Sequence, residues 1–584
     1  MVKQKKAIFY VLLIIILAGI VSIIKRCFYG IETTDEAYYI ANANLILQGN
    51  TPIATIWTFQ SGSLIIYTWL LGLYKFFVPD LVGVFLYMRI CFTIFRLVIL
   101  IYAYFSLKKV IGDISALCAC AVLVPYYGLI NQFSYVTCAE NMLVLTGIIV
   151  FNAVYSTKKR QLYWGMAGIT VALAICSHPS MIINALFIVL VCCVLSDKKI
   201  CSMISVIAGG LGTAAAILIW IVISEGGIGN LIFSINHLMT TPSQNTKPDK
   251  MLTIIEAMEA LEQEISSWPI FGQIFAIIAF LVIVIKKTNI IKILQQCFTI
   301  GIMAWFISKV FSQLSMQAEY GLNGEGLNVC FGVWVGIASI TIFLINKKDW
   351  LNMTVFLAMC CPSIIFAISN GMLTGGGLYG RLGSIIPAGM GLIIMLVHNL
   401  EEIEFPVNIS YGSGILVFLA GMIFILVYDY AYVYRDNPIA ELNYKVEEGI
   451  YKGIYTTQIN AESLPEIEET IREYTKDCNT IKAMDCAPEA YLMTDAEALT
   501  PTTWDDMHYA DGKNDPSYVY DYFKFMDDIP DAIVYVASPG KPNPSIFQEG
   551  YLFNEFVNEK YEQIYYNSYG NLDYELVIYK RKAI

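Results

Sequence analysis

Two adjacent carboxylates, Asp35 and Glu36, are the residues of this sequence best placed to do chemistry. They follow the first long apolar run and precede an aromatic-rich segment. A carboxylate can act as a general base that takes a proton from a hydroxyl group, and aromatic rings can stack on sugars or lie at a membrane interface. A solvated loop end is the alternative interpretation of such a pair. The nearby rings are those of Tyr38, Tyr39, Trp57 and Tyr67.

The composition indicates a membrane protein with many spans. The 584 residues are 57% hydrophobic and 15% charged, whereas ordinary soluble domains are about 25% charged. Residues 431–584 contain 28 Asp and Glu against 13 Lys and Arg, a net charge of -15, so the total of -11 leaves +4 for the rest. A mildly basic membrane part is therefore joined to an acidic, water-soluble tail. Neither part has the clustered basic surface typical of nucleic-acid binding.

Residues 7–24 predict an uncleaved membrane anchor. They are apolar and no small-residue cleavage site follows them. At about 1.5 Å per residue, this stretch crosses most of a hydrocarbon core of about 30 Å. The lysines before it, Lys3, Lys5 and Lys6, place the N-terminus in the cytoplasm by the positive-inside rule.

Five later basic clusters set the orientation of the other spans. Successive clusters are separated by two apolar runs, which places all five on one side. That side is the cytoplasm if residues 61–78 lie along the membrane interface instead of crossing it. A long first external loop, about residues 25–83, then contains the acidic pair. The clusters are Lys108-Lys109, Lys158-Lys159-Arg160, Lys198-Lys199, Lys286-Lys287 and Lys347-Lys348.

This arrangement predicts a polytopic α-helical membrane domain of thirteen spans over residues 1–430. An odd number places the tail, residues 431–584, outside the cell, where its pattern predicts an extracytoplasmic α/β domain. The predicted tail elements are helices at 464–475, 518–527 and 547–561 and strands at 533–536 and 575–579. The predicted spans lie near 7–24, 84–106, 113–130, 138–155, 162–177, 180–196, 203–223, 268–285, 290–310, 328–345, 351–369, 383–398 and 409–428.

Cysteine usage gives little functional information. Most of the fifteen cysteines lie in apolar runs, and no CxxC or Cys/His metal spacing is present. Cys478 and Cys486 lie in the tail. Two alternatives stay open for them, a short-loop disulfide or two free thiols.

The order of these features resembles the GT-C membrane glycosyltransferases, in the glycosyltransferase 39-like branch of protein O-mannosyltransferases and aminoarabinose transferases. Beyond the anchor, acidic pair and juxtamembrane segment, the shared features are a span beginning Tyr87-Met88-Arg89 and a late Tyr379-Gly380-Arg381 followed by Pro387. The resemblance covers about residues 7–400. Where relatives have His-Pro-Pro or Glu-Lys-Pro, this chain has Gln60-Ser61-Gly62-Ser63. One metal ligand or phosphate contact is therefore missing.

The resemblance implies roles for individual residues. Asp35 corresponds to the catalytic base, with Glu36 as its neighbour. Glu140 corresponds to a second acidic position that binds acceptor hydroxyls or a divalent cation, or is only an interfacial polar residue. Arg381 holds donor phosphate or ordinary lipid headgroups. His178 marks a turn between two spans or contacts lipid phosphate. A divalent cation is the one cofactor left open.

The implied reaction moves a sugar from a polyprenyl-phosphate donor to an extracytoplasmic glycan, lipid or protein at the cell membrane. Nucleotide sugars are absent outside the cell, so the donor must arrive through the lipid bilayer. A phosphate with a second pKa of about 6 leaves without a general acid, so one carboxylate that deprotonates the acceptor suffices, and the anomeric centre inverts. An adjacent pair in an extended loop points to opposite sides, so only one of the two carboxylates can face the reacting centre. The resemblance to the family implies that Asp35 is the base, with Tyr38 and Tyr39 beside the substrate.

Two other classes of protein stay open. A polysaccharide polymerase or ligase also acts outside on lipid-linked sugars, but it would centre on a large late external loop. A transporter or flippase needs no base, and the lack of an internal repeat and of many mid-membrane charges in the sequence argues against an ion-coupled one. Trp504-Asp505-Asp506 has a faint likeness to the Trp-Trp-Asp signature of oligosaccharyltransferases. One Trp is missing, and we interpret the segment as a loop.

Overall fold

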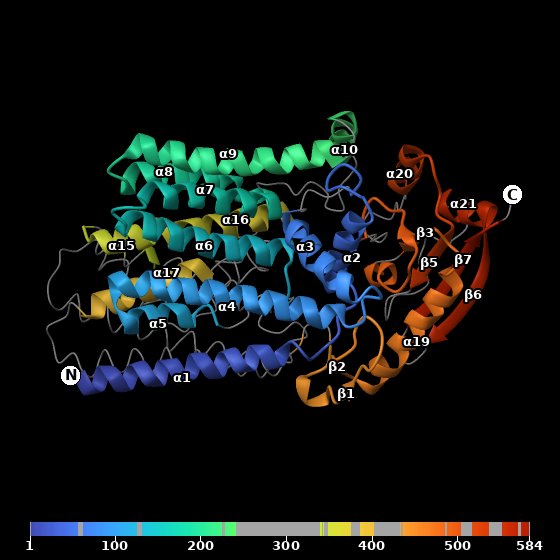
Figure 1. Cartoon of the computed structure of the whole chain (residues 1–584), viewed down its shortest axis with the longest axis horizontal. Helices are drawn as coiled ribbons and strands as arrows, with labels where there is room; N and C mark the ends of the chain where they lie inside the picture. Colours follow the sequence, from blue (N-terminus) through green and yellow to red (C-terminus); the bar gives the residue numbers. More distant parts are fainter. Residues whose placement is uncertain are drawn as a thin grey trace, which may run out of the picture.

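The computed structural model shows a bundle of long helices joined to a C-terminal region of helices and strands (Figure 1). The N-terminus lies at the far end of the bundle, and the C-terminus lies at the opposite end of the molecule. The structure describes residues 2–56, 62–124, 131–224, 228–240, 339–340, 343, 348–374, 386–401, 433, 436–484, 487–503, 517–536, 552–569 and 574–582.

The bundle consists of apolar helices that lie side by side along the long axis of the molecule (Figure 1). A helix satisfies its own backbone hydrogen bonds, which a lipid environment requires. Within the described residues, five helical stretches are long and apolar enough to cross a membrane: Lys6–Arg26, Val84–Ile111, Tyr135–Tyr155, Lys199–Ser224 and Trp350–Ser369. The helices are α1 (Val2–Arg26), α4 (Val84–Ile111), α5 (Asp113–Ala121), α6 (Tyr135–Tyr155), α7 (Arg160–Ser177), α8 (Ile182–Leu195), α9 (Lys199–Ser224), α10 (Ile228–Thr240), α15 (Trp350–Val355), a π-helical turn (Phe356–Cys360), α16 (Cys361–Thr374) and α17 (Ile386–Glu401).

Most of the predicted spans that fall on described residues are helices close to their predicted bounds. The exception is 113–130, because α5 ends at Ala121 and the chain turns at Val122–Val124. Pro125 follows in the sequence, and a proline disfavours the helical conformation in the residue before it. The predicted spans at 268–285, 290–310 and 409–428, and most of 328–345, lie outside the described residues, so the number thirteen stays a prediction.

The segment predicted to lie along the membrane is helix α3 (Gly62–Phe77). It packs beside α2 (Asp35–Leu47) at the end of the bundle nearest the C-terminal region (Figure 1). Trp69, Phe76 and Phe77 of α3 are strongly exposed. Exposed aromatic side chains are typical of helices at a membrane–water interface. The interfacial orientation of α3 stays a prediction.

The C-terminal region contains a five-stranded sheet with the strand order β4-β3-β5-β7-β6. Strand β3 is parallel to β4 and β5, whereas β7 is antiparallel to β5 and β6. The central strand β5 is buried along its whole length, as expected for a strand covered on both faces. The elements are β1 (Tyr444–Lys445), β2 (Tyr455–Thr456), α19 (Gln458–Thr475), β3 (Thr480–Met484), β4 (Glu497–Ala498), α20 (Ser517–Met526), β5 (Ala532–Val536), α21 (Leu552–Lys560), β6 (Tyr561–Tyr569) and β7 (Tyr574–Arg581).

The predicted tail elements at 518–527, 533–536 and 575–579 are present as α20, β5 and β7. Helix α19 begins earlier than predicted because the side chain of Thr457 accepts a hydrogen bond from the Asn460 N–H at 3.3 Å and caps it. Helix α21 ends at Lys560, one residue before the end of the predicted helix 547–561, because residues from Tyr561 onward pair with β7. Residues 547–551 of that prediction lie outside the described residues.

Cys478 is a free, buried thiol, and burial raises its pKa. Its suggested disulfide partner, Cys486, lies outside the described residues. The free-thiol alternative is therefore the one that the structure shows for Cys478.

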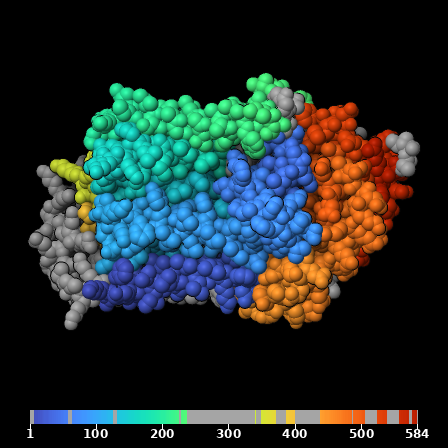
Figure 2. All heavy atoms as spheres, viewed as in Figure 1, coloured from blue at the N-terminus to red at the C-terminus, as the bar shows by residue number. Residues whose placement is uncertain are grey.

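The C-terminal region packs directly on the first loop and on the start of α4. The carbonyl of Tyr455 accepts a hydrogen bond from the Gly30 N–H at 2.8 Å, and the Tyr455 ring stacks on Tyr29 with centroids 5.4 Å apart. Phe85 of α4 stacks on Tyr451 at 4.2 Å. Figure 2 shows the orange C-terminal atoms directly against the blue N-terminal ones. The two parts thus share one buried core around α2.

Candidate active site

Asp35 and Glu36 lie in the first turn of α2, so the predicted extended geometry is wrong. The buried side chain of Glu32 explains why the helix begins here. Its Oε1 accepts a hydrogen bond from the Thr34 N–H at 3.1 Å, and its Oε2 accepts one from the Glu36 N–H at 2.6 Å. Glu32 thus satisfies N–H groups that have no partner within the helix. Sequence analysis did not identify this capping residue.

Glu36 belongs to a buried ion pair. Its side chain is 2% exposed, and that of its partner, Arg89 of α4, is 6% exposed. Arg89 Nε donates to Glu36 Oε1 at 2.6 Å, and Arg89 Nη2 donates to Oε2 at 2.5 Å. Such a bidentate pair is geometrically specific. Removing one partner would leave a buried, uncompensated charge.

Two other segments hold this pair in place. Arg89 Nη1 donates to the carbonyl oxygens of Cys27 and Tyr29, at 3.2 and 3.3 Å. The fully buried Gln132 donates from Nε2 to the Glu36 carbonyl at 2.6 Å. The end of α1, helix α4 and the segment before α6 therefore fix the first turn of α2. These contacts are tertiary, so no short motif could have indicated them.

Asp35 differs from Glu36 because it is half-buried. A carboxylate in the first turn of a helix interacts favourably with the helix dipole, so the fold accommodates the charge of Asp35 while leaving the side chain partly accessible. Of the two adjacent carboxylates, Asp35 is the more accessible one.

The tyrosines near Asp35 are packed more tightly than predicted. Tyr39 is 4% exposed and stacks on the fully buried Tyr67, with ring centroids 6.0 Å apart. Tyr135 of α6 lies against Tyr39 at 6.1 Å, and burial raises the pKa of Tyr39 well above its usual value. The expectation that Tyr39 and Tyr67 offer open faces to a sugar is therefore wrong. Tyr38 is half-buried and keeps part of its surface accessible.

His178 and Glu140 are buried within the bundle. The His178 ring lies between Tyr135 and Phe366, with centroids 5.5 and 5.4 Å away, and its Nδ1 is 2.8 Å from Ser180 Oγ. These are the contacts of a packed histidine at the turn between α7 and α8. Glu140 of α6 is 5% exposed, which does not fit the alternative of a solvated interfacial residue.

The predicted contact Arg381 and the aromatic residue Trp57 lie outside the described residues. So do Gln60 and Ser61, where a contact of the family is missing, and Trp504-Asp505-Asp506, which we interpreted as a loop. A metal site can be assessed only among the residues that the structure describes. In the described part of the chain, no three His, Cys, Asp or Glu side chains lie close enough together to hold a metal ion. The divalent cation that the sequence left open at Glu140 has no ligand set among those residues.

Asp436 connects the C-terminal region to the site. Its Oδ2 accepts hydrogen bonds from the Ile31 N–H at 2.7 Å and from Thr456 Oγ1 at 2.9 Å. Burial raises the pKa of Asp436, although the hydrogen bonds and the charge of Arg89 act in the opposite direction. Because Ile31 directly precedes Glu32, Asp436 helps to position the residue that caps α2.

No protein-family model and no curated protein matches the chain. Among solved structures, the chain is similar to the oligosaccharyltransferase of Archaeoglobus fulgidus in a crystal structure with Zn and sulfate, with a TM-score of 0.48 and 13% identity over 95% of this chain and 72% of that one. The same archaeon's oligosaccharyltransferase AglB, in complex with an inhibitory peptide and a dolichol-phosphate, gives a TM-score of 0.44 and 10% identity, over 90% and 69%.

A third structure, the Archaeoglobus fulgidus enzyme tethered to an acceptor peptide with an NVT sequon, gives a TM-score of 0.44 and 13% identity, over 98% of this chain and 74% of that one. Likeness at these TM-scores carries no weight in assigning a function.

Proposed function

We propose that this protein is a GT-C-type membrane glycosyltransferase that moves a sugar from a polyprenyl-phosphate donor to an extracytoplasmic acceptor, a glycan, lipid or protein. The observation that carries the proposal is the contrast within the acidic pair. Glu36 is neutralised by Arg89 and buried, while Asp35 beside it is partly accessible and lies in the helix turn that Glu32 and Gln132 hold by hydrogen bonds to the Glu36 backbone. A general base needs both accessibility and a fixed position.

The reaction needs one proton acceptor. Asp35 takes the proton from the acceptor hydroxyl, whose oxygen attacks the anomeric carbon of the donor. The bond between that carbon and the phosphate oxygen breaks, and its electron pair stays on the phosphate. Because a phosphate with a second pKa of about 6 departs as a stable anion, no general acid is required. Attack opposite the leaving phosphate inverts the anomeric centre.

The other residues support this reaction in the proposal. Glu36 and Arg89 position α2, and Tyr38 borders the sugar. Arg381 holds donor phosphate. Oxyanions are stabilised most by cations that are already in place.

The proposal places the site outside the cell at the plasma membrane. The C-terminal region contacts α2 directly, so the tail and Asp35 share one side. The positive-inside rule assigns the opposite side, near Lys158, to the cytoplasm. A reporter fused after Ile584 should be external, and a cysteine introduced near Lys158 should be labelled only from the cytoplasm. Labelling of that site from outside would overturn the orientation.

The direct test of function uses purified full-length protein and polyprenyl-phosphate sugars carrying a labelled sugar, with cell-envelope glycans, lipids or proteins as acceptors. We expect transfer with inversion, detected by mass spectrometry and by the anomeric NMR coupling. Asp80→Asn is a matched control, because Asp80 lies exposed in the same predicted external loop. Transfer without inversion, or an Asp35→Asn variant as active as Asp80→Asn, would contradict the proposal. Lipid translocation without transfer would favour a flippase.

A further inference from the structure

The two edges of the five-stranded sheet in the C-terminal region have different surroundings. At one edge, β4 has only two residues, and its Ala498 N–H donates to Oε1 of Gln48, the residue after α2, at 3.2 Å. At the other edge, β6 has nine residues. In the part of the chain that the structure describes, β6 pairs only with β7. Because neighbouring strands are about 4.8 Å apart, β6 lies roughly 19 Å from β4 across the sheet.

The β6 edge lacks the usual protection over half of its length. An edge strand is a template for another chain, and proteins protect such edges with short strands, bulges, prolines or charged side chains. The register of β6 shifts between Gln563 and Tyr565. Beyond this point, residues 565–569 pair regularly with β7 and include no proline and no charged residue. In the five β7 residues that face them, only Glu575 is charged. The segment 565–569 is therefore regular and unprotected.

Two tyrosines of this segment lie on opposite faces of the sheet, because successive side chains of a strand alternate. Tyr565 packs on Tyr474 of α19, with ring centroids 4.7 Å apart. Tyr566 is 54% exposed, and its hydroxyl donates to Glu575 Oε1 at 3.4 Å. Tyrosine is enriched in protein–protein interfaces, since it combines a large apolar ring with a polar hydroxyl. Tyr566 therefore provides an anchor on the face of the sheet away from α19.

Helix α19, which lies alongside β6 (Figure 1), carries a row of exposed glutamates on one face. They are spaced three or four residues apart, so their like charges repel each other. Among the described residues, the ion pair of α19 joins Arg472 to Glu468 at 3.1 Å and includes no member of the row. The row ends next to Tyr474, the residue that contacts β6, so β6 has an acidic flank. The glutamates of the row are Glu462, Glu466, Glu469 and Glu473.

We propose that residues 565–569 of β6 bind an extended, lysine- or arginine-rich segment of a partner protein, which adds a sixth strand to the sheet. The backbone N–H and C=O groups of the edge hold the segment, as in other cases of strand addition. Every second side chain of the added strand lies on the α19 side of the sheet. Cations at these positions relieve the repulsion within the acidic row. The C-terminal region is then an assembly surface, in addition to its contacts with the first loop.

Charge and backbone geometry both favour a basic polypeptide as the occupant. Residues 431–584 carry 28 Asp and Glu against 13 Lys and Arg, a net charge of -15, which attracts a basic segment and speeds its association. The same charge repels nucleic acids and anionic glycans. Only another polypeptide backbone presents N–H and C=O groups at the spacing of a strand edge. The net charge thus brings the segment to the C-terminal region, and pairing with β6 fixes its position.

The test measures peptide binding to purified full-length protein in phosphatidylcholine nanodiscs by fluorescence anisotropy. The probe is a labelled peptide of about ten alternating threonines and lysines, the length of a long strand. A proline–lysine peptide has the same charge but lacks half of the N–H donors, and a threonine–glutamate peptide has the opposite charge. The threonine–lysine peptide should bind at least about tenfold more tightly than either, since several hydrogen bonds or the charge attraction are lost in the others. No binding, or equal binding of the proline–lysine peptide, would overturn the proposal.

Hydrogen exchange and a charge variant locate the binding site. The bound peptide should slow amide exchange in residues 565–569, and protection confined to other elements would contradict the proposal. Tyr566→Lys should weaken binding by about tenfold or more, because a lysine on an edge strand disfavours pairing and repels the basic segment. Tyr444→Lys is the matched control: Tyr444 lies in strand β1, is 47% exposed, and its replacement changes the net charge equally. Equal effects of the two variants would show attraction by net charge alone and overturn the proposal.

A double variant of α19 tests the acidic flank without changing β6. Glu469→Gln combined with Glu473→Gln should weaken binding of the threonine–lysine peptide more than Glu447→Gln combined with Glu448→Gln. The second pair consists of exposed carboxylates of the same region that lie outside α19. Equal losses in the two double variants would show that the row on α19 does not contact the segment, and the proposed basic partner would be wrong.

Two further outcomes concern the identity of the occupant. If the protein without peptide forms dimers in detergent that Tyr566→Lys abolishes, the occupant is a second copy of this chain, and the proposal of a separate partner is wrong. The Asp35→Asn variant should bind the peptide as wild type does, because β6 is at the edge of the sheet away from α2. Peptide binding by a protein that transfers no sugar would therefore contradict the proposed function and leave this inference intact.

Discussion

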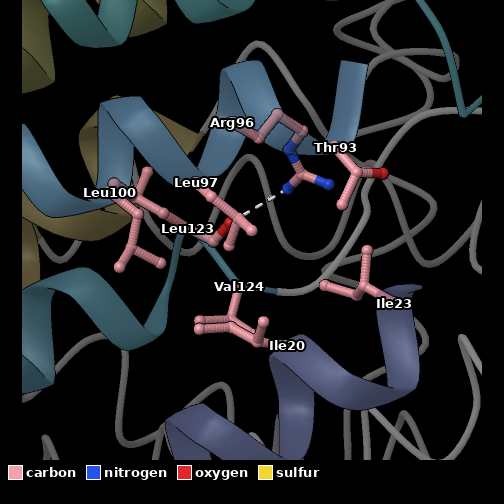
Figure 3. Close-up of a pocket in the computed structure, with 8 residues that line it drawn as sticks. All are labelled: Ile20, Ile23, Thr93, Arg96, Leu97, Leu100, Leu123 and Val124. Atoms are coloured by element: carbon pink, nitrogen blue, oxygen red, sulfur yellow. Dashed lines mark hydrogen bonds between the residues drawn. The ribbon is translucent and has the colours of Figure 1, made fainter. Parts of the chain in front are cut away.

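Two arginines on one face of α4 have different surroundings. Arg89 is almost fully buried, and both of its terminal nitrogens and Nε have partners in the protein. Arg96, about two turns away, is half-buried and donates to the Leu123 carbonyl at 2.9 Å (Figure 3). Arg89 is thus a buried cation paired with a carboxylate, whereas Arg96 is partly accessible. The same difference in accessibility separates Glu36 from Asp35.

This difference in burial shows how a site with few polar residues can be built in a membrane protein. The start of α4 is held by the C-terminal region, through the contact of Phe85 with Tyr451. The part of α4 around Arg96 is less buried. The buried start of α4 also holds the first turn of α2, through the pair of Arg89 and Glu36.

The largest effect on stability is expected at Arg89. Arg89→Leu leaves Glu36 as a buried charge without its partner, so the free energy of unfolding should fall by about 3–5 kcal/mol. Denaturant unfolding in detergent measures this. A loss below about 1 kcal/mol, the value of an exposed ion pair, would show that the pair is not buried as described.

A double replacement is the matched control for Arg89. Replacing a buried ion pair with apolar residues of similar size is often neutral for stability. Arg89→Met combined with Glu36→Leu should therefore recover most of the stability that Arg89→Leu loses. If the double variant is as unstable as the single one, the loss comes from packing around α4 and not from the unpaired charge.

A smaller effect, visible only as a function of pH, is expected at Asp436. Its pKa is raised in the folded protein by burial, so folding favours the protonated form. The stabilising contribution is present at low pH and is lost as the pH rises through the folded-state pKa. Asp436→Asn should remove this dependence, so wild type should lose stability relative to the variant as the pH rises.

The melting temperature at several pH values measures the Asp436 effect. Glu468 also has a raised pKa because of burial, so part of the slope should remain in Asp436→Asn. Glu447→Gln is the control, because Glu447 is an exposed carboxylate of the same region. Parallel curves for wild type and Asp436→Asn would show that Asp436 does not contribute.

The helices could be predicted from the sequence where an apolar run has the length of a span. Helices α6 and α9 follow directly from this pattern. Helix α5 could not, because the apolar run continues past the turn at Val122–Val124 and conceals it. Strand β6 was missed because the tyrosines at 561, 565, 566 and 569 do not follow the two-residue alternation typical of a strand, and it is stabilised by pairing with β7. The local pattern of apolar residues thus predicts long helices better than it predicts where a helix ends early or which strands pair.

The candidate site was predictable only in part. Asp35 and Glu36 could be identified by their residue types and their place after an apolar run. The capping role of Glu32, the ion pair with Arg89 and the link to Asp436 depend on tertiary contacts between distant segments. The buried state of Tyr39 also depends on such contacts, because Tyr67 and Tyr135 come from other helices.

The most direct test of the account compares Asp35→Asn with Glu36→Gln in the same transfer assay and the same unfolding measurement. Asp35→Asn keeps the size of the side chain but cannot take a proton, so transfer should fall by about 100- to 10,000-fold with an unchanged melting temperature. Glu36→Gln should lose less transfer but should unfold at a lower temperature, because Arg89 loses its charged partner. Near-normal transfer by Asp35→Asn would contradict the account at its centre.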